Sequence, residues 1–248
     1  MKHEMKIVHI SDLHIGTTQF LPEKLWRCVE EINLLKPDLV VVTGDITMFG
    51  FRDEYEEARM YMEKINAPKL IIPGNHDARY CGDKYFDRFF GFGNKVMNFS
   101  GDVTLIGVDS SVPDLDEGTV GRGKQRWLRK ELQKIPKNKF KIVAIHHHLV
   151  PIPNTGRERN ILTDAGDVLN LLIDENVDLV LCGHRHTPHV WVIENLPIIT
   201  AGTPSGEKLR ANVVNCYNII NITKDSIEIF LKEVGGGKKQ MRKCKRKK

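Results

Sequence analysis

Five short apolar runs, rich in valine and isoleucine, recur along the chain. They occupy residues 6–10, 39–42, 70–72, 142–145 and 179–181. Each run is too short to form a helix, and its β-branched residues favour a strand that is buried on both faces. The pattern therefore predicts five core strands.

Amphipathic segments lie between or beside these runs. Residues 22–35 begin with a proline, which suits the first turn of a helix, and residues 54–65 and 164–175 carry apolar positions at helical spacing. Residues 121–135 place Trp127 and Leu128 on one face, which predicts a helix laid over a sheet. The alternation of strand and helix predicts an α/β protein with parallel strands joined by right-handed crossovers.

Helical spacing is absent from three other segments. Residues 95–99, 103–108 and 190–231 are expected to form antiparallel strands. Residues 235–248 contain three glycines followed mainly by lysine and arginine, a composition typical of a disordered tail. We therefore expect one catalytic domain over residues 1–234 and a disordered tail over residues 235–248.

The composition is that of an ordinary globular protein, with 41% hydrophobic and 28% charged residues. No apolar run approaches the roughly 20 residues that a transmembrane helix needs. The N-terminus lacks the apolar core of a signal peptide, and the five cysteines form no C-x-x-C pair. A cytoplasmic protein with reduced thiols is the expectation.

Positive charge is concentrated at the C-terminus. Of the 37 basic residues, eight lie in residues 238–248, which leaves 29 basic residues against 32 acidic ones elsewhere. The body of the protein is therefore mildly acidic. The basic tail suits either weak contact with a polyanion or a purely solubilising role.

Polar residues that can bind metal follow every one of the five apolar runs. The groups are Asp12 with His14, Asp45 after Gly44, Asn75-His76-Asp77, the three histidines His146-His147-His148, and His184-Arg185-His186. The carboxyl ends of parallel strands lie along one edge of a sheet, where ligands bind. The spacing therefore predicts that these side chains form a single site.

The residue types indicate the metals. Carboxylate and amide oxygens combined with imidazoles favour Mn, Fe, Zn or Co over Mg. The set exceeds the four ligands of one tetrahedral zinc, and a carboxylate can bridge two cations. Two divalent metal ions are therefore expected, acting on a phosphate ester with water as the nucleophile.

In order and spacing, these motifs resemble the calcineurin-like metallophosphoesterase superfamily. The resemblance implies that Asp12, His14 and His186 hold one metal, that Asn75, His146 and His184 hold the other, and that Asp45 bridges them. It also implies that hydroxide bridging the metals attacks phosphorus. His76 is then a catalytic residue that faces the phosphate, is not a ligand, and is oriented by a nearby carboxylate.

Additional blocks resemble the class III cyclic-nucleotide phosphodiesterase branch. They are Asp109-Ser110, Gln125 with Trp127-Leu128, residues 202–205 and residues 217–220. The resemblance implies a four-layer α-β-β-α sandwich of two mixed sheets. It also implies a phosphodiesterase that acts on a small phosphate ester such as a cyclic nucleotide.

Several alternatives remain open from the sequence. His147 or His148 could replace His146, and the activity could be that of a broad-specificity phosphomonoesterase or a nuclease. A metal-binding scaffold without turnover is the alternative outside enzymes. The pocket walls are expected from residues 48–53, 79–84 and 151–163, and the last of these contains Arg157, Arg159 and Asn160, for which solvent-exposed charges are the default interpretation.

Overall fold

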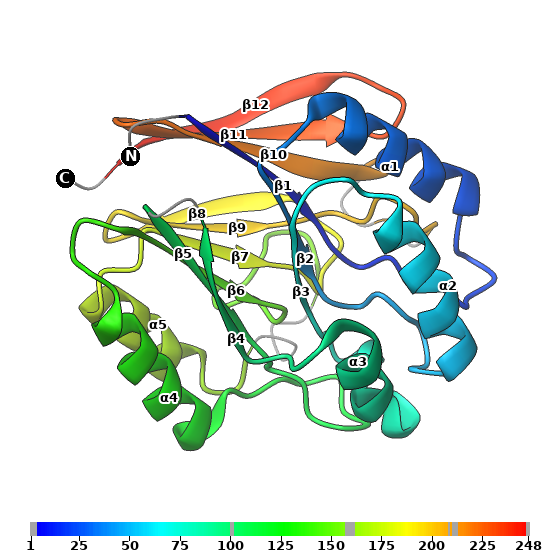
Figure 1. Cartoon of the computed structure of the whole chain (residues 1–248), viewed down its shortest axis with the longest axis horizontal. Helices are drawn as coiled ribbons and strands as arrows, with labels where there is room; N and C mark the ends of the chain where they lie inside the picture. The colour runs from blue at the N-terminus through cyan, green and yellow to red at the C-terminus, as the bar shows by residue number, and fades with distance from the viewer. Residues whose placement is uncertain (1–3, 100–101, 157–161, 208, 210–212, 247–248) are drawn as a thin grey trace.

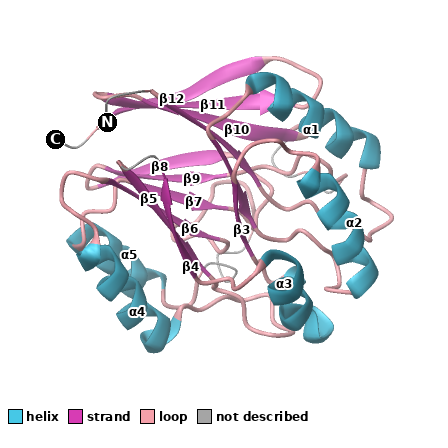
Figure 2. Cartoon of the chain, viewed as in Figure 1, coloured by secondary structure: helices cyan, strands magenta, loops and turns pink. Residues whose placement is uncertain are grey.

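The strands form two mixed six-stranded sheets that pack face to face, with helices on both outer faces (Figure 1; Figure 2). This is the predicted four-layer α-β-β-α sandwich. The computed structural model describes the whole chain except residues 1–3, 100–101, 157–161, 208, 210–212 and 247–248.

The first sheet has the strand order β12-β11-β10-β1-β2-β3. Strands β1, β2 and β3 are parallel, whereas β10, β11 and β12 continue the sheet in antiparallel fashion from β1. The bounds are β1 Met5–Ile10, β2 Leu39–Thr43, β3 Lys69–Ile72, β10 Cys216–Ile222, β11 Ser226–Glu233 and β12 Lys238–Lys245. Three helices cover the outer face of this sheet: α1 Pro22–Leu35, α2 Arg52–Glu63 and α3 Gly82–Phe90.

The second sheet has the strand order β4-β5-β6-β7-β9-β8. Its four central strands are parallel, and the edge strands β4 and β8 are antiparallel to their neighbours. The bounds are β4 Lys95–Phe99, β5 Val103–Val108, β6 Phe140–Ile145, β7 Leu179–Cys182, β8 His189–Ile193 and β9 Leu196–Thr200. Helices α4 Gly121–Lys134 and α5 Ala165–Asp174 cover its outer face.

The main core lies between the two sheets. Inward side chains of the first sheet, such as Ile7 and Val41, pack against Ile142 and Leu181 of the second, and all four are fully buried. Because strand side chains alternate between faces, the remaining apolar side chains of each sheet pack against the helices on its outer face. Within the described residues, no helix is both long and apolar enough to cross a bilayer.

Most elements predicted from the sequence are present, and the departures concern a loop, a strand direction and the C-terminal tail. The segment 79–84, expected as a pocket loop, contributes to the 3₁₀ helix η1 His76–Cys81 and to the start of α3. Tyr80 and Cys81 have left-handed backbones (φ 46° and 66°), so the chain bends sharply before α3 begins. In addition, β9 pairs parallel with β7, although antiparallel strands were expected throughout residues 190–231.

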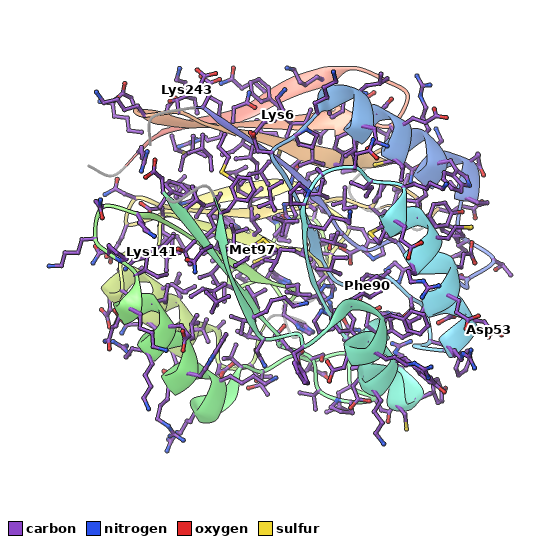
Figure 3. All side chains as sticks on the ribbon, in the orientation of Figure 1. Lys6, Asp53, Phe90, Met97, Lys141 and Lys243 are labelled. Carbon is purple, nitrogen blue, oxygen red and sulfur yellow. The ribbon has the colours of Figure 1, made fainter. Side chains whose placement is uncertain are left out.

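The expectation of a disordered tail is wrong for residues 238–245. These residues form β12, which pairs antiparallel with β11, and the glycines before it make the hairpin turn, where the N–H of Gly236 donates to the carbonyl of Glu233 at 3.0 Å. Met241 and Cys244 pack against the core between the sheets, as does Met97 of β4 (Figure 3). This strand is held by its pairing with β11 and by the packing of a few side chains on the core, and composition alone reveals neither.

Candidate metal centre

Loops from both sheets meet at the carboxyl ends of their strands. The N–H of Asp12 donates to the carbonyl of Gly44 (2.9 Å), and the N–H of Gly183 donates to the carbonyl of His146 (2.8 Å). The N–H of His184 donates to the carboxylate of Asp12 at 3.0 Å and thereby links the two sheets. The predicted site therefore forms, but at the junction of two sheets and not along one sheet edge.

The backbone at this junction is strained in a consistent way. Asp12, His14, Asp45, His184 and His186 all have positive φ angles, between 52° and 76°. Residues with side chains seldom adopt this left-handed conformation, and they concentrate at functional sites when they do. These backbone bends bring the side chains of five candidate ligands together.

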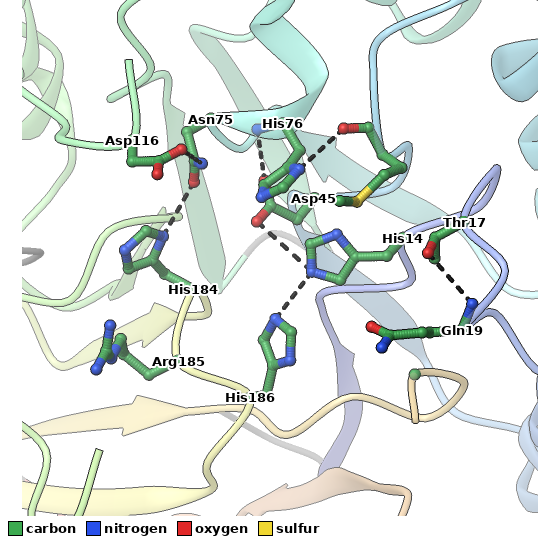
Figure 4. A pocket seen from close by; sticks show the side chains of 12 residues that line it. His14, Thr17, Gln19, Asp45, Asn75, His76, Asp116, His184, Arg185 and His186 are labelled. Atoms are coloured by element: carbon green, nitrogen blue, oxygen red, sulfur yellow. Dashed lines mark hydrogen bonds and ion pairs between the residues drawn. The ribbon is translucent and has the colours of Figure 1, made fainter. Parts of the chain in front are cut away.

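A first group of ligands combines one carboxylate and two imidazoles. Nε2 of His14 lies 2.8 Å from Nε2 of His186 (Figure 4). The same nitrogen of His186 lies 3.4 Å from Oδ1 of Asp12. All three side chains are buried, so water does not shield these groups from one another. The structure thus brings together the three residues predicted for the first metal.

A second group forms around Asn75. Its amide nitrogen donates to Asp116 at 3.3 Å, so the amide oxygen faces His184 Nδ1 at 3.0 Å (Figure 4). The same oxygen lies 3.1 Å from Nε2 of His146. His146 Nδ1 must carry its proton, because it donates to the Thr43 carbonyl at 2.6 Å. Its Nε2 therefore directs a lone pair toward the amide oxygen unless a second proton or a cation intervenes.

Asp45 lies between the two groups. Its Oδ2 is 3.3 Å from Nε2 of His146 and 3.8 Å from Nε2 of His14, while Oδ1 accepts from the backbone N–H of His76 at 2.9 Å. Gly74 permits this packing, since a Cβ at that position would collide with Oδ1 of Asp45. One carboxylate can therefore reach both groups.

The electrostatics of the cluster suit cations. Burial lowers the pKa of His14 and of His184 well below the usual value, so both rings are neutral and offer lone pairs. Burial also acts to lower the pKa of His146, but the Asp45 carboxylate outweighs it and raises the value to about 9. Each short contact between two ring nitrogens, or between a ring nitrogen and the Asn75 oxygen, can hold one proton, and a cation that replaced this proton would be bound by both lone pairs. The residues present therefore fit two metal ions.

The three consecutive histidines have different surroundings. Both ring nitrogens of His147 have protein partners: Nδ1 contacts the Ser110 hydroxyl at 2.8 Å, and Nε2 contacts the Asp116 carbonyl at 3.1 Å. The ring of His148 stacks against His184 at 5.7 Å. Only His146 places a nitrogen against both Asn75 and Asp45, in keeping with its position directly after β6.

His76 lies beside the ligand groups. Its ring meets that of His14 edge-on, with centroids 4.7 Å apart, and its Nδ1 donates to the Met48 carbonyl at 2.9 Å. The orienting group is thus a carbonyl, where the family resemblance implied a carboxylate. Because Nδ1 holds a proton for this bond, Nε2 is the atom that is available to a substrate.

Two buried carboxylates support the site, and the sequence did not reveal their roles. Asp77 accepts from the N–H groups of Ile46, Thr47 and Gly74, at 3.0, 2.9 and 2.9 Å, and so ties together the loops that carry Asp45 and Asn75. Glu54 accepts from the backbone of the loop that follows Thr47. In the sequence, an acidic residue that accepts hydrogen bonds from the site's backbone looks the same as one that is exposed to solvent.

The groups open into a cavity of about 140 Å³. Its walls include five of the seven candidate ligands and His76; the ligands are His14, Asp45, Asn75, His184 and His186. Thr17, Gln19, Met48, Asp116 and Arg185 also line it. Arg157, Arg159 and Asn160 lie outside the described residues. The expected wall at residues 48–53 contributes through Met48.

Comparison with known proteins agrees with this geometry. The sequence model of the calcineurin-like phosphoesterase family matches residues 5–188. A probable glycerophosphodiester phosphodiesterase GpdQ of Arcobacter nitrofigilis is 31% identical, over 81% of this chain and 79% of the relative. A 3',5'-cyclic-nucleotide phosphodiesterase of Nostoc is 27% identical, over 75% and 73%.

The fold is also shared with a solved structure. The purple acid phosphatase PPD1 of yellow lupin superposes with a TM-score of 0.76 at 13% identity, over 99% of this chain and 54% of the lupin protein. The chain belongs to the calcineurin-like phosphoesterase family of metal-dependent phosphoric ester hydrolases, which use a dinuclear divalent metal centre.

Proposed function

We propose that this protein is a phosphodiesterase that uses two divalent metal ions to hydrolyse cyclic nucleotides or other small phosphate diesters. Asp12, His14 and His186 hold one metal, and Asn75, His146 and His184 hold the other. Asp45 bridges the two, and His76 serves the leaving group.

One observation carries the proposal: two groups of buried ligands share a single carboxylate, Asp45, beside His76, whose Nδ1 is held by the Met48 carbonyl. A structural metal site typically has about four protein ligands, no open coordination position and no need for an additional acid–base residue. A shared carboxylate with an additional acid–base group matches the requirements of phosphoryl transfer to water.

Each residue has a distinct part in this mechanism. Divalent cations in such a pair act as Lewis acids, activate water and stabilise charge on the phosphate oxygens. Asp45 and the buried imidazoles fix the substrate phosphate by fixing those cations. His76 holds its Nδ1 proton on the Met48 carbonyl, so that Nε2, when protonated, is directed to donate to the departing oxygen.

The substrate class follows from the pocket and from the relatives. The cavity is lined by polar and charged side chains such as Gln19, Asp116 and Arg185, which can contact a small phosphate ester. The two relatives named above are both phosphodiesterases by name, one for glycerophosphodiesters and one for cyclic nucleotides.

The proposed metals are Mn, Fe, Zn or Co, because imidazole nitrogens make up more than half of the ligand set. The proposed location is the cytoplasm, whose reducing conditions suit five unpaired cysteines. The basic residues of β12 support weak contact with a polyanion in addition to the catalytic function.

The test is reconstitution after chelation. Mn, Fe, Zn, Co and Mg are restored separately, metal per chain is counted, and hydrolysis of bis-p-nitrophenyl phosphate, p-nitrophenyl phosphate and 3',5'-cyclic AMP is measured. We expect activity to reach its maximum at two metals per chain, with diesters preferred.

Stoichiometric metal without turnover of any ester would reject the enzymatic proposal in favour of a scaffold. A preference for the monoester would reject the diesterase assignment but retain the dinuclear centre.

A further inference from the structure

Three aromatic side chains, two exposed and one half-buried, form a cluster that we call the aromatic shelf: Phe51, Tyr80 and Phe49. The ring centroids of Phe49 and Phe51 are 5.7 Å apart, and those of Phe51 and Tyr80 are 5.4 Å apart, with interplanar angles of 30° and 32°. Phe51 is 48% exposed and Tyr80 is 62% exposed. Large apolar side chains that touch one another at the surface commonly mark a binding site.

The shelf is built from two segments, the loop between β2 and α2 and the kinked part of η1. Gly50 has a φ of +71°, and a Cβ there would lie only 2.5 Å from the Arg79 carbonyl oxygen, so the backbones of the two segments are in direct contact. Tyr80 is held in the left-handed conformation, and its N–H donates to Asp114 at 3.0 Å. Figure 1 shows the corresponding elements, α2 and α3, side by side.

Both segments are continuous in sequence with residues at the cavity wall. Met48, which precedes Phe49, lines the cavity and binds His76 through its carbonyl. Arg79, which precedes Tyr80, pairs with Asp116 at 2.6 Å, and Asp116 is also in the cavity wall. Phe49 and Tyr80 are thus each one peptide bond away from a residue that lines the cavity or pairs with its wall.

We propose that the aromatic shelf stacks the nucleobase of a nucleotide whose phosphate is bound at the metal centre. The inference deepens the proposed function and rests on it for the position of the phosphate. Every nucleobase has a π face that stacks on aromatic side chains, whereas a glycerol group has none. The shelf therefore selects nucleotide esters over glycerol diesters, and it does so with little preference among bases.

The experiment measures binding, so that it does not depend on turnover. Calorimetry with the metal-loaded full chain compares 5'-AMP, which carries a base and a phosphate, with glycerol 3-phosphate, which carries the phosphate alone. For either ligand that the enzyme hydrolyses, KM replaces Kd. The variants are Phe51→Ala and Tyr80→Ala, with Tyr80→Phe to restore the ring.

We expect wild type to bind 5'-AMP about 10-fold or more tightly than glycerol 3-phosphate, as one stacked base predicts. Each alanine variant should lose most of that advantage while keeping its affinity for glycerol 3-phosphate, and Tyr80→Phe should regain what Tyr80→Ala loses. Phe92→Ala is the matched control, because Phe92 is 75% exposed and lies beyond the opposite end of α3. It should change neither affinity.

Two results would overturn the assignment. An equal loss of affinity for 5'-AMP and for glycerol 3-phosphate in the alanine variants would show that the shelf only supports the structure. An unchanged 5'-AMP affinity in both alanine variants would show that the shelf does not bind the base. In the second case, a wild-type dimer that dissociates on Phe51→Ala would reassign the shelf to self-association. Selective 5'-AMP binding without hydrolysis of any diester would instead reject the proposed function and retain the shelf.

Discussion

Glu54 supports the loop that orients His76, and its removal should slow the reaction without releasing metal. The carboxylate is 7% exposed, and a single oxygen, Oε2, accepts from the N–H groups of Phe49 (2.9 Å) and Phe51 (3.1 Å). Those two residues flank Gly50 in the loop whose Met48 carbonyl binds His76 Nδ1. Glu54→Ala would leave both donors without an acceptor.

The size of the effect follows from these bonds. Each N–H bond to a charged acceptor contributes about 1.5–3 kcal/mol, so losing two is enough to displace a surface loop. A displacement of about 1 Å in a catalytic group can lower a rate by about 10²-fold. We therefore expect kcat to fall by about 10- to 100-fold, while two metals remain bound, because Glu54 contacts no candidate ligand other than through this loop.

The assay measures kcat and metal per chain with a glycerol diester, a substrate that the aromatic shelf does not affect. Glu54→Gln should recover most of the rate, since its amide oxygen can occupy the place of Oε2. Glu56→Ala is the control on the same helix: Glu56 pairs with Arg52 at the surface (2.8 Å), an interaction that contributes only about 0.5 kcal/mol. An unchanged rate in Glu54→Ala, or metal loss in proportion to rate, would refute the reasoning.

Three more predictions concern the site and the last strand. His186→Ala should lose metal and turnover together, whereas His76→Ala should keep both metals and lose about 10²-fold or more in kcat; equal metal loss would contradict these roles. Metal binding near pH 7 should release a proton from His146. Burial acts to lower the pKa of this ring, but the Asp45 carboxylate has the larger effect, so the pKa is raised to about 9 and the ring is protonated before metal binds. The apparent affinity should rise with pH up to about 9, and calorimetry in buffers of different ionisation enthalpy would detect a missing proton. Deletion of residues 238–248 should lower stability by about 2 kcal/mol or more, as measured by thermal melting, because Met241 and Cys244 lose their packing; an unchanged Tm would contradict this role of β12.

The sequence predicted the central strands well because their burial on both faces leaves an unambiguous apolar run. Leu39–Thr43, for example, is buried at every position, and the short apolar run at residues 39–42 predicts this strand. The last strand, Lys238–Lys245, was missed for the opposite reason. Its solvent-facing positions carry charge, and its inward positions gain their packing from β11 and from the second sheet.

The candidate ligands could be found from their positions after apolar runs, but their supporting groups could not. The Met48 carbonyl that binds His76 belongs to the backbone and leaves no trace in residue type. The amide of Asn75 is oriented by Asp116, 41 residues away in the chain, through a contact that only the folded protein creates. Such contacts fix the direction of a ligand, which spacing cannot encode.

The division of the ligands between the sheets explains why the site depends on the whole fold. Asp12 and His14 follow β1 of the first sheet, whereas their partner His186 follows β7 of the second. Asn75 follows β3 of the first sheet, and its partners His146 and His184 follow β6 and β7. A slip of one sheet against the other would separate both groups at once. The close-packed core between the sheets, remote from the metals, therefore sets the distances within the catalytic centre.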